Sequence, residues 1–289
     1  MNEQRAEEIV TAITGRRYNI TAVKPAHGGC ISDSYSLITL EDNLFLKESG
    51  LNQKDMFEAE ACGLKELARC ESLKVPDVLG TYETDSNCYI LLENLNLKPH
   101  NPLSLQKLGQ SLAQMHRIRA EKFGFTHNNY IGSTPQINNK CDSWVDFYNH
   151  CRLMPQAYMT GNDEIIDKAE ELSAKTATFF SDYTPVPSLL HGDLWSGNTA
   201  RLSNDTPVIY DPAVYYGDRE TDIAFTEFFG GFTNDFYHSY YDSWELHPGY
   251  EIRRYLYQLY HSLNHLNLFG NSYLKRSIEM LDYLLKVKY

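Results

Sequence analysis

One segment in the second half of the chain constrains the fold more than any other. It reads His-Gly-Asp-Leu-Trp-Ser-Gly-Asn over residues 191–198, and it lies between two short apolar pieces, Ser188-Leu-Leu and Pro207-Val-Ile-Tyr. Apolar runs of this length, bounded by glycine and polar residues, are typical of short strands. The next acidic residue is Asp211, in Ile-Tyr-Asp-Pro. The segment therefore predicts a strand–loop–strand unit that presents acidic and amide side chains on neighbouring loops.

The first third of the chain alternates apolar and polar residues as strands do, with helical spacing in two places. The expected elements are strands within 20–46, near 78–83 and near 89–92, and helices at 3–14 and 53–70. From Ser104 onward the pattern is mostly helical, apart from the strand–loop–strand unit. This order predicts an α+β protein with a small β-rich lobe at 1–95 and a larger, mostly helical lobe at 96–289. We expect a cleft at the connector between them.

Composition and net charge argue against two classes of binding partner, nucleic acids and membranes. Lys and Arg number 26 against 38 Asp and Glu, a net charge of −12, and no basic run is present. Such a chain repels nucleic acid and anionic membrane surfaces. No apolar stretch approaches the ~20 residues of a membrane span. The six cysteines are scattered without metal-ligand spacing, and the first residues do not resemble a secretory signal. We expect a cytoplasmic protein, a monomer or weak dimer, that binds neither nucleic acid nor membrane.

The residues of the strand–loop–strand unit suit the transfer of a phosphoryl group. That reaction needs a metal and a cation to neutralise phosphate charge, and a carboxylate that orients the attacking hydroxyl. Asp193 is predicted to be the catalytic base, and Asn198 and Asp211 are predicted to bind Mg²⁺ through oxygen atoms. Either aspartate alone is read more simply as a turn residue. Together, at this spacing, they resemble the catalytic core of kinases.

A cation for the phosphates is expected at Lys47, at the end of a predicted strand. A lysine on a strand commonly faces water, but here a predicted helix follows and carries Glu58 and Glu60. We expect Glu60 to pair with Lys47 and Glu58 to be solvated. Gly28 and Gly29 lie between the first two predicted strands, where backbone N–H groups can approach the phosphates of ATP.

With these parts placed, the chain resembles the superfamily of aminoglycoside phosphotransferases and protein kinases, and within it the fructosamine kinase (ketosamine-3-kinase) family. The broad resemblance rests on Lys47, Glu60, residues 191–198, Asp211 and Asp222. The narrower one rests on segments that are more particular to the family. They are 56–61, 123–125, 129–138, 144–147, 152–156, 216–222 and 257–267.

The resemblance implies a two-lobed, protein-kinase-like fold and ATP-dependent phosphorylation of the sugar 3-hydroxyl of a ketosamine, a sugar attached to an amine by glycation. Phosphorylation makes the adduct unstable, so that the amine is restored. Ribulosamines, erythrulosamines and fructosamines all remain open as substrates, free or on protein. Glu93 and Leu95, in the connector, are expected to contact the nucleotide.

Aromatic and polar residues around the loop are candidates for the acceptor site. Trp195 is read equally as a platform for the sugar ring and as a buried anchor of the loop. His265 is a candidate substrate contact together with His261 and Asn264, although core packing is the commoner role for such residues. We expect His191 to support the loop by hydrogen bonding. Asp222 is expected to cap a helix and to brace the loop.

Two other functions are compatible with the same residues. One is a kinase of this fold that acts on an aminoglycoside, choline or a sugar. The particular segments 129–138 and 152–156 argue against it, but we expect them to lie away from the chemistry. The other is a non-catalytic nucleotide-binding module, which the full set of catalytic residues disfavours. We also hypothesise that oxidation of Cys30, next to Gly29, blocks the nucleotide loop; activity of a Cys30→Ala variant through an oxidation–reduction cycle tests this.

Overall fold

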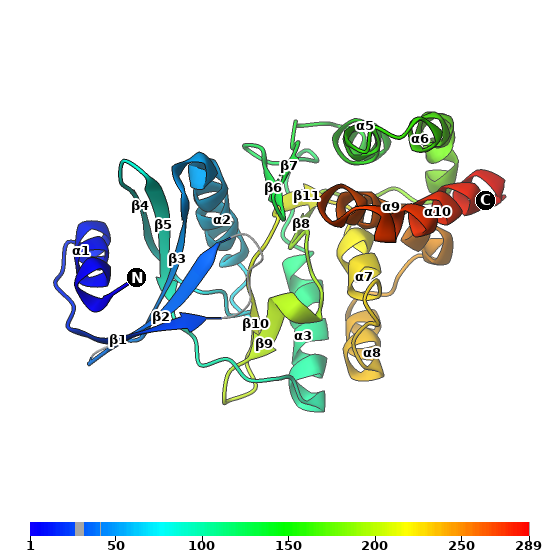
Figure 1. The fold of residues 1–289 in the computed structure, drawn as a ribbon. Helices are drawn as coiled ribbons and strands as arrows, with labels where there is room; N and C mark the ends of the chain where they lie inside the picture. Colours follow the sequence, from blue (N-terminus) through cyan, green and yellow to red (C-terminus); the bar gives the residue numbers. More distant parts are fainter. Residues whose placement is uncertain (27–31, 41, 289) are drawn as a thin grey trace.

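The computed structural model describes residues 1–26, 32–40 and 42–288. Its N-terminal lobe is built on a five-stranded antiparallel sheet of order β1-β2-β3-β5-β4 (Figure 1). The strands are β1 (Ile20–Ala26), β2 (Asp33–Thr39), β3 (Leu44–Gly50), β4 (Val78–Glu83) and β5 (Asn87–Glu93). The strands expected from alternation are therefore confirmed.

Two helices cover opposite faces of this sheet (Figure 1). Side chains alternate along a strand, so Tyr89 and Leu91 of β5 pack with α1 (Glu3–Thr14), while Ile90 and Leu92 belong to the core that contains α2 (Lys54–Leu67). Gly15 ends α1 with a φ of 70°, which glycine adopts without strain. The expected helix at 53–70 is present but shorter at both ends, because Leu51–Gln53 form a 3₁₀ turn before it and the helix ends at Leu67.

The C-terminal lobe is mostly helical, as predicted. In this lobe α3 packs against α8, and the long α9 packs against α7 and α10 (Figure 1). The helices are α3 (Pro102–Met115), α4 (Trp144–Tyr148), α5 (Met154–Met159), α6 (Asp163–Lys175), α7 (Glu220–Thr226), α8 (Asn234–Ser243), α9 (Tyr250–Phe269) and α10 (Leu274–Lys286). Among the described residues, no helix combines the length and apolar character needed to cross a membrane.

Three short two-stranded sheets interrupt the helices and position the loops. They are β6 (Asn129–Ile131) with β7 (Thr134–Gln136), β8 (Ser188–Leu190) with β11 (Tyr215–Gly217), and β9 (Thr199–Arg201) with β10 (Pro207–Ile209). The order strand, loop, strand, acidic loop predicted for residues 188–211 is therefore present. Backbone hydrogen bonds join Lys74 of the N-terminal lobe to β10 and Lys98 of the connector to β9, so both lobes meet this unit.

The connector lies between β5 and α3 and contains the boundary predicted at residue 95. Asn101 begins α3 by a reciprocal cap with Ser104, which fixes the point where the chain enters the helical lobe.

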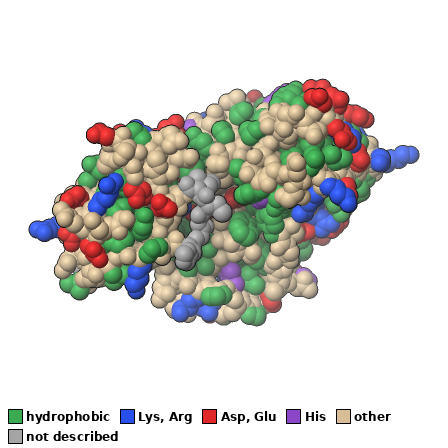
Figure 2. Space-filling view, viewed as in Figure 1, with side chains coloured by type: hydrophobic (Ala, Val, Ile, Leu, Met, Phe, Trp, Pro, Cys, Tyr) green, Lys and Arg blue, Asp and Glu red, His purple; other side chains and the backbone are tan. Residues whose placement is uncertain are grey.

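On the face shown in Figure 2, acidic and basic side chains are interspersed over both lobes.

Candidate active site

The loop that follows β8 carries the candidate base and is folded by its own side chains. The Nδ2 group of Asn198 donates hydrogen bonds to the backbone oxygen of Asp193 at 2.8 Å and to its Oδ2 at 2.9 Å. A 3₁₀ turn at Ser196–Asn198 brings the two residues together. Burial raises the pKa of the Asp193 carboxyl to about 7, and the carboxylates of Asp211 and Asp222 add to the rise. The hydrogen bond from Asn198 lowers this pKa but is outweighed.

Asp222 braces this loop from helix α7. Its Oδ2 accepts a hydrogen bond from the backbone N–H of His191 at 2.8 Å, and its Oδ1 accepts one from Gly192 at 2.9 Å. The predicted brace is therefore confirmed. The predicted helix cap is wrong, because Arg219 is the N-cap residue of α7 and Asp222 lies inside the first turn.

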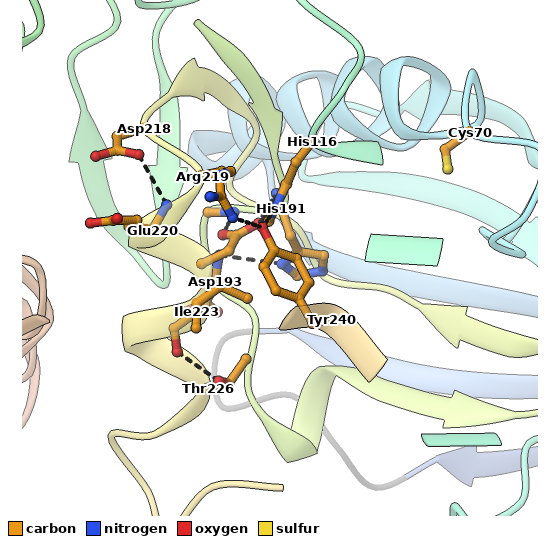
Figure 3. A network of polar contacts seen from close by, with 12 residues as sticks. Cys70, His116, His191, Asp193, Asp218, Arg219, Glu220, Ile223, Thr226 and Tyr240 are labelled. Atoms are coloured by element: carbon orange, nitrogen blue, oxygen red, sulfur yellow. Dashed lines mark hydrogen bonds and ion pairs between the residues drawn. The ribbon is translucent and has the colours of Figure 1, made fainter. Parts of the chain in front are cut away.

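His191 and His116, both drawn in Figure 3, support the loop and Asp222 by hydrogen bonds. The Nδ1 of His191 accepts from the Asp193 backbone N–H at 3.2 Å, so the proton sits on Nε2, which donates to the Tyr210 carbonyl at 3.0 Å. His116 lies 3.2 Å from Asp222 through Nε2 and 2.8 Å from the Tyr240 hydroxyl through Nδ1. Burial lowers the pKa of both histidines, which keeps the rings neutral.

Gly192 allows the catalytic loop to press against the segment after Asp211. Its φ is 80°, and a Cβ there would lie 2.0 Å from the carbonyl oxygen of Ala213. The backbone N–H of Ala213 in turn donates to the carbonyl of His191 at 2.9 Å. Only glycine permits this approach, so the two acidic loops form one unit.

Lys47 of β3 forms ion pairs with a carboxylate from each lobe. Its Nζ lies 2.6 Å from Glu60 Oε1 in α2 and 2.6 Å from Asp211 Oδ1. Burial disfavours the charge on Lys47, but the two carboxylates outweigh it and raise the pKa of the ammonium group. The contact expected with Glu60 is present, whereas Glu58 is exposed and lies near Lys54. Asp211 has a φ of 54°, a left-handed conformation that aspartate tolerates better than most residues.

These side chains open onto a cavity of 660 Å³ at the junction of the lobes. Lys47, Glu60, Asp193, Asn198 and Asp211 all line it. The other described residues of its wall come from both lobes. They are Ser32, Met56, Phe57, Ala59, Asn129, Tyr130, Ile131, Gly132, Ser133, Trp195, Pro212, Ala213, Phe225, Phe229, Asn264, His265, Leu268, Phe269 and Tyr273.

Asn198 and Asp211 have the donor chemistry of a magnesium site. Because Asn198 uses Nδ2 to bond Asp193, its amide oxygen is left for the cavity, where Asp211 presents a carboxylate that is 37% exposed. An amide oxygen and a carboxylate oxygen are ligands that Mg²⁺ accepts. The residues therefore fit the ion.

Aromatic rings form the far wall of the cavity. The indole of Trp195 meets Phe229 edge to face, with ring centroids 5.5 Å apart, and covers Gly197. His265 lies 5.1 Å from the rings of Phe229 and Tyr273. Trp195 and His265, the predicted substrate contacts, both line the cavity, as does Asn264, whereas His261 is fully buried behind Phe225 and is not part of the described wall.

Four of the predicted nucleotide contacts are not among the described residues of the cavity wall. Gly28, Gly29 and Cys30 lie outside the described residues. Neither Glu93 nor Leu95 is among the described residues of the cavity wall, and the Glu93 carboxylate pairs with Lys74 at 2.6 Å. A role for these residues at the nucleotide stays a prediction.

The expectation that segments 129–138 and 152–156 lie away from the chemistry is wrong for the first of them. The β6–β7 hairpin contributes its residues 129–133 to the cavity wall. Its Asn129 donates to the carbonyl of Val214 at 2.7 Å, and Gln136 donates to that of Ala213 at 3.1 Å. The hairpin therefore supports the segment after Asp211 while facing the cavity.

Arg152 anchors this hairpin through hydrogen bonds and ring stacking. Among the described residues, no carboxylate forms an ion pair with it. It is 1% exposed, donates to the Ile137 carbonyl at 2.6 Å and to Asn138 Oδ1 at 2.8 Å, and stacks 3.9 Å over the ring of Tyr215. The sequence analysis did not find this buried network, because its members are polar residues that are ordinary in loops. A proline three residues after Arg152, within a helical pattern, is the local signal that could have drawn attention to it.

The fructosamine kinase family matches residues 1–287 of this chain. A "Probable ketoamine kinase" of Synechocystis is 38% identical over 98% of this chain and 97% of its own length. A chloroplastic protein-ribulosamine 3-kinase of Oryza sativa subsp. japonica is 37% identical over 94% of this chain and 81% of its own.

Solved structures agree with this match. A "Putative fructosamine-3-kinase" of Haemophilus somnus superposes with a TM-score of 0.88 at 29% identity, over 97% of this chain and 96% of that one. An aminoglycoside phosphotransferase superposes with a TM-score of 0.68 at 15% identity, over 98% of each chain, which shows that the kinase-like fold is shared. The chain belongs to the fructosamine kinase family.

Proposed function

We propose that this protein is an ATP- and Mg²⁺-dependent kinase that phosphorylates the sugar 3-hydroxyl of ketosamines, a repair step for glycated amines. The observation that carries the proposal is that Lys47, Asp193, Asn198 and Asp211 face one cavity. Family membership and relatives named ketoamine kinase and protein-ribulosamine 3-kinase support the choice of acceptor.

The proposed mechanism assigns Asp193 to the hydroxyl that attacks. A carboxyl group whose pKa is about 7 takes up a proton more readily than an ordinary aspartate, and the amide of Asn198 holds its Oδ2 in place. Lys47 would bind the nucleotide phosphates, with Glu60 orienting its ammonium group. Asn198 and Asp211 would hold Mg²⁺, which neutralises phosphate charge when bound.

The aromatic wall is proposed to bind the ketosamine. Trp195 offers an aromatic face to the sugar ring. The Nδ1–H of His265 donates to the carbonyl of His261 at 2.8 Å, so the neutral ring presents the lone pair of Nε2. Burial lowers the pKa of His265, and Arg276 adds to this, which keeps that lone pair available to accept from a sugar hydroxyl.

We further propose that the protein is cytoplasmic, a monomer or weak dimer, and binds neither nucleic acid nor membrane. The five described cysteines are all free thiols, which supports a reducing compartment. The net charge of −12 and the interspersed charges of the face in Figure 2 support the absence of a nucleic-acid partner. Light scattering after size-exclusion chromatography measures the oligomeric state.

A comparison of acceptors tests the proposed substrate class. ATP consumption is measured with ribulosamine, erythrulosamine, fructosamine, choline and kanamycin, with Asp193→Ala as the inactive control. We expect kcat/KM for a ketosamine to exceed that for choline or kanamycin by at least ~100-fold. A higher value for choline or kanamycin would support the rival small-molecule kinase. If the parent protein phosphorylates none of these acceptors, the result would support the non-catalytic module.

A further inference from the structure

The cavity wall includes a buried polar side chain that the proposed chemistry leaves unused. Asn264 of α9 is 1% exposed and lines the cavity beside His265. Its Oδ1 accepts a hydrogen bond from Gln156 Nε2 at 3.3 Å. Within the described part of the chain, its Nδ2 has no hydrogen-bond partner. This nitrogen is also not among the fully buried polar atoms that lack a partner, so part of its surface is accessible.

The direction of the Asn264 amide is fixed by a relay that begins at a backbone carbonyl. Asn267 Nδ2 donates to the carbonyl oxygen of Gln156 at 3.0 Å and to its Oε1 at 2.7 Å. A carbonyl only accepts, so Asn267 must present its NH₂ group. The Oε1 of Gln156 is thereby occupied, and its Nε2 must face Asn264 and donate. Asn264 therefore turns Oδ1 to Gln156 and Nδ2 to the cavity.

We propose that Asn264 is a specificity-determining residue that donates from Nδ2 to a sugar oxygen of the ketosamine other than the attacked 3-hydroxyl. Gln156 and Asn267 act as positioning residues. The inference rests on the proposed function and adds to it a fixed donor at the acceptor end of the cavity. Ketone and hydroxyl oxygens of an open-chain ketosamine both accept hydrogen bonds.

The surroundings explain why this one donor has a large effect on selectivity. Phe225, Phe229 and Phe269 line the same cavity and lie around His265, the residue next to Asn264. Aromatic faces bind sugars with little preference among hydroxyl positions. A ligand that leaves a buried donor without an acceptor binds more weakly than one that supplies the acceptor. Sugars lacking an oxygen at one position are therefore discriminated against at this site.

The test uses the full chain with Asn264→Ala, the isosteric Asn264→Asp and Gln156→Glu. Asn271→Asp is the control, because Asn271 is exposed just after α9 and is not among the described wall residues. The substrates are ribulosamine and analogues that each lack one oxygen other than the 3-hydroxyl. KM and kcat are measured for each substrate and for ATP.

We expect Asn264→Asp and Asn264→Ala to lower kcat/KM for ribulosamine about 10- to 100-fold through KM, with KM for ATP unchanged. Gln156→Glu, which cannot donate to Asn264, is expected to give a smaller loss. For one analogue, the parent and the Asn264 variants should have the same low kcat/KM. The oxygen missing from that analogue is the one to which Asn264 donates. Asn271→Asp should behave as the parent.

Three results would overturn the inference. They are an unchanged KM for ribulosamine in the Asn264 variants, an equal loss on every analogue, and a matching rise in KM for ATP. If the variants do not fold, Gln156→Glu decides by the same analogue pattern. A parent protein that phosphorylates no ketosamine would instead overturn the proposed function, so the two failures are distinguishable.

Discussion

Asp193 depends on residues that lie behind the cavity wall. The backbone N–H groups of His191 and Gly192 are fixed by Asp222, and Asp222 is bonded by His116 on its other side. Every member of this set is buried and most are polar, so each is costly to leave without its partner. The position of one carboxylate is thus set by helices α3 and α7 as well as by its own loop.

Asp193→Asn keeps the shape of the side chain and removes its basicity. We expect kcat to fall about 10³-fold because the attacking hydroxyl loses the group that accepts its proton. Nucleotide affinity should be retained, since Lys47 and Asp211 are untouched. Coupled measurement of ADP release with ribulosamine checks the rate, and Asp142→Asn, at an 81% exposed side chain, is the control. A variant with parental kcat would remove Asp193 from the mechanism.

Gly197→Ala tests the part played by Trp195. A Cβ at Gly197 would lie 2.3 Å from the indole ring, so the ring must move away from its place on the loop. We expect KM for the ketosamine to rise about tenfold while KM for ATP stays the same. Ser196→Ala is the neighbouring control. If the sugar KM does not change, Trp195 is an anchor of the loop and not a sugar platform.

At the scale of elements, Arg152 ties a helix to the β6–β7 hairpin. It lies in a π-helical turn at Asn149–Leu153, between α4 and α5. Pro155 has no N–H to offer the carbonyl of Cys151 four residues before it, and Arg152 Nη1 donates to that carbonyl at 2.8 Å instead. The proline and the arginine together make the turn possible.

Arg152→Lys keeps the charge but loses the planar fork of donors. We expect the free energy of unfolding to fall by about 3 kcal/mol, because carbonyl and amide oxygens of the network are left without donors. Urea denaturation measures this loss. The exposed Arg17→Lys is the matched control, with an expected change within about 0.5 kcal/mol. Equal stability of the two variants would contradict the role assigned to Arg152.

The sequence allowed the elements and part of the site to be predicted, for local reasons. Alternation along residues 20–46 reflects a sheet with a helix on either face, and the pairing of Lys47 with Glu60 follows from a strand that leads into a helix. The contact of Asn129 with Val214 could not be predicted, because it joins residues distant along the chain by side chains that are ordinary in loops. The same reason hid the relay from Asn267 to Asn264.

At the scale of the whole molecule, burial keeps several histidines neutral. Burial lowers the pKa of His100 to about 4, and Arg201 adds to the effect. His100 joins the connector to β9, with Nε2 3.0 Å from Thr199 Oγ1. The unfolded chain binds a proton at this residue near pH 6.5 and the folded chain does not, so its contribution to stability falls as pH drops from about 6.5 toward about 4.

His100→Asn isolates this contribution. Below pH 6.5 we expect the parent to lose stability more steeply than the variant, by up to about 1.4 kcal/mol per pH unit. Asp193, whose pKa is raised, acts in the opposite direction in both proteins, so the difference between them is the measure. Denaturant midpoints from pH 7.5 to 4.5 check it, with the exposed His238→Asn as the control. Parallel curves for parent and His100→Asn would refute the assignment.

The double ion pair of Lys47 has a consequence for the order in which ligands enter. One ammonium group serves as internal counter-ion to a carboxylate of each lobe, at 2.6 Å in both cases. A divalent cation that arrives alone meets the ammonium group of Lys47 beside Asp211, and the two positive charges repel each other. An anion that brings its own divalent cation lets Lys47 turn to the anion while Asp211 turns to the metal, and every charge keeps a partner. Under the proposed function, Lys47 and Asp211 would therefore suit a nucleotide that enters together with its magnesium ion.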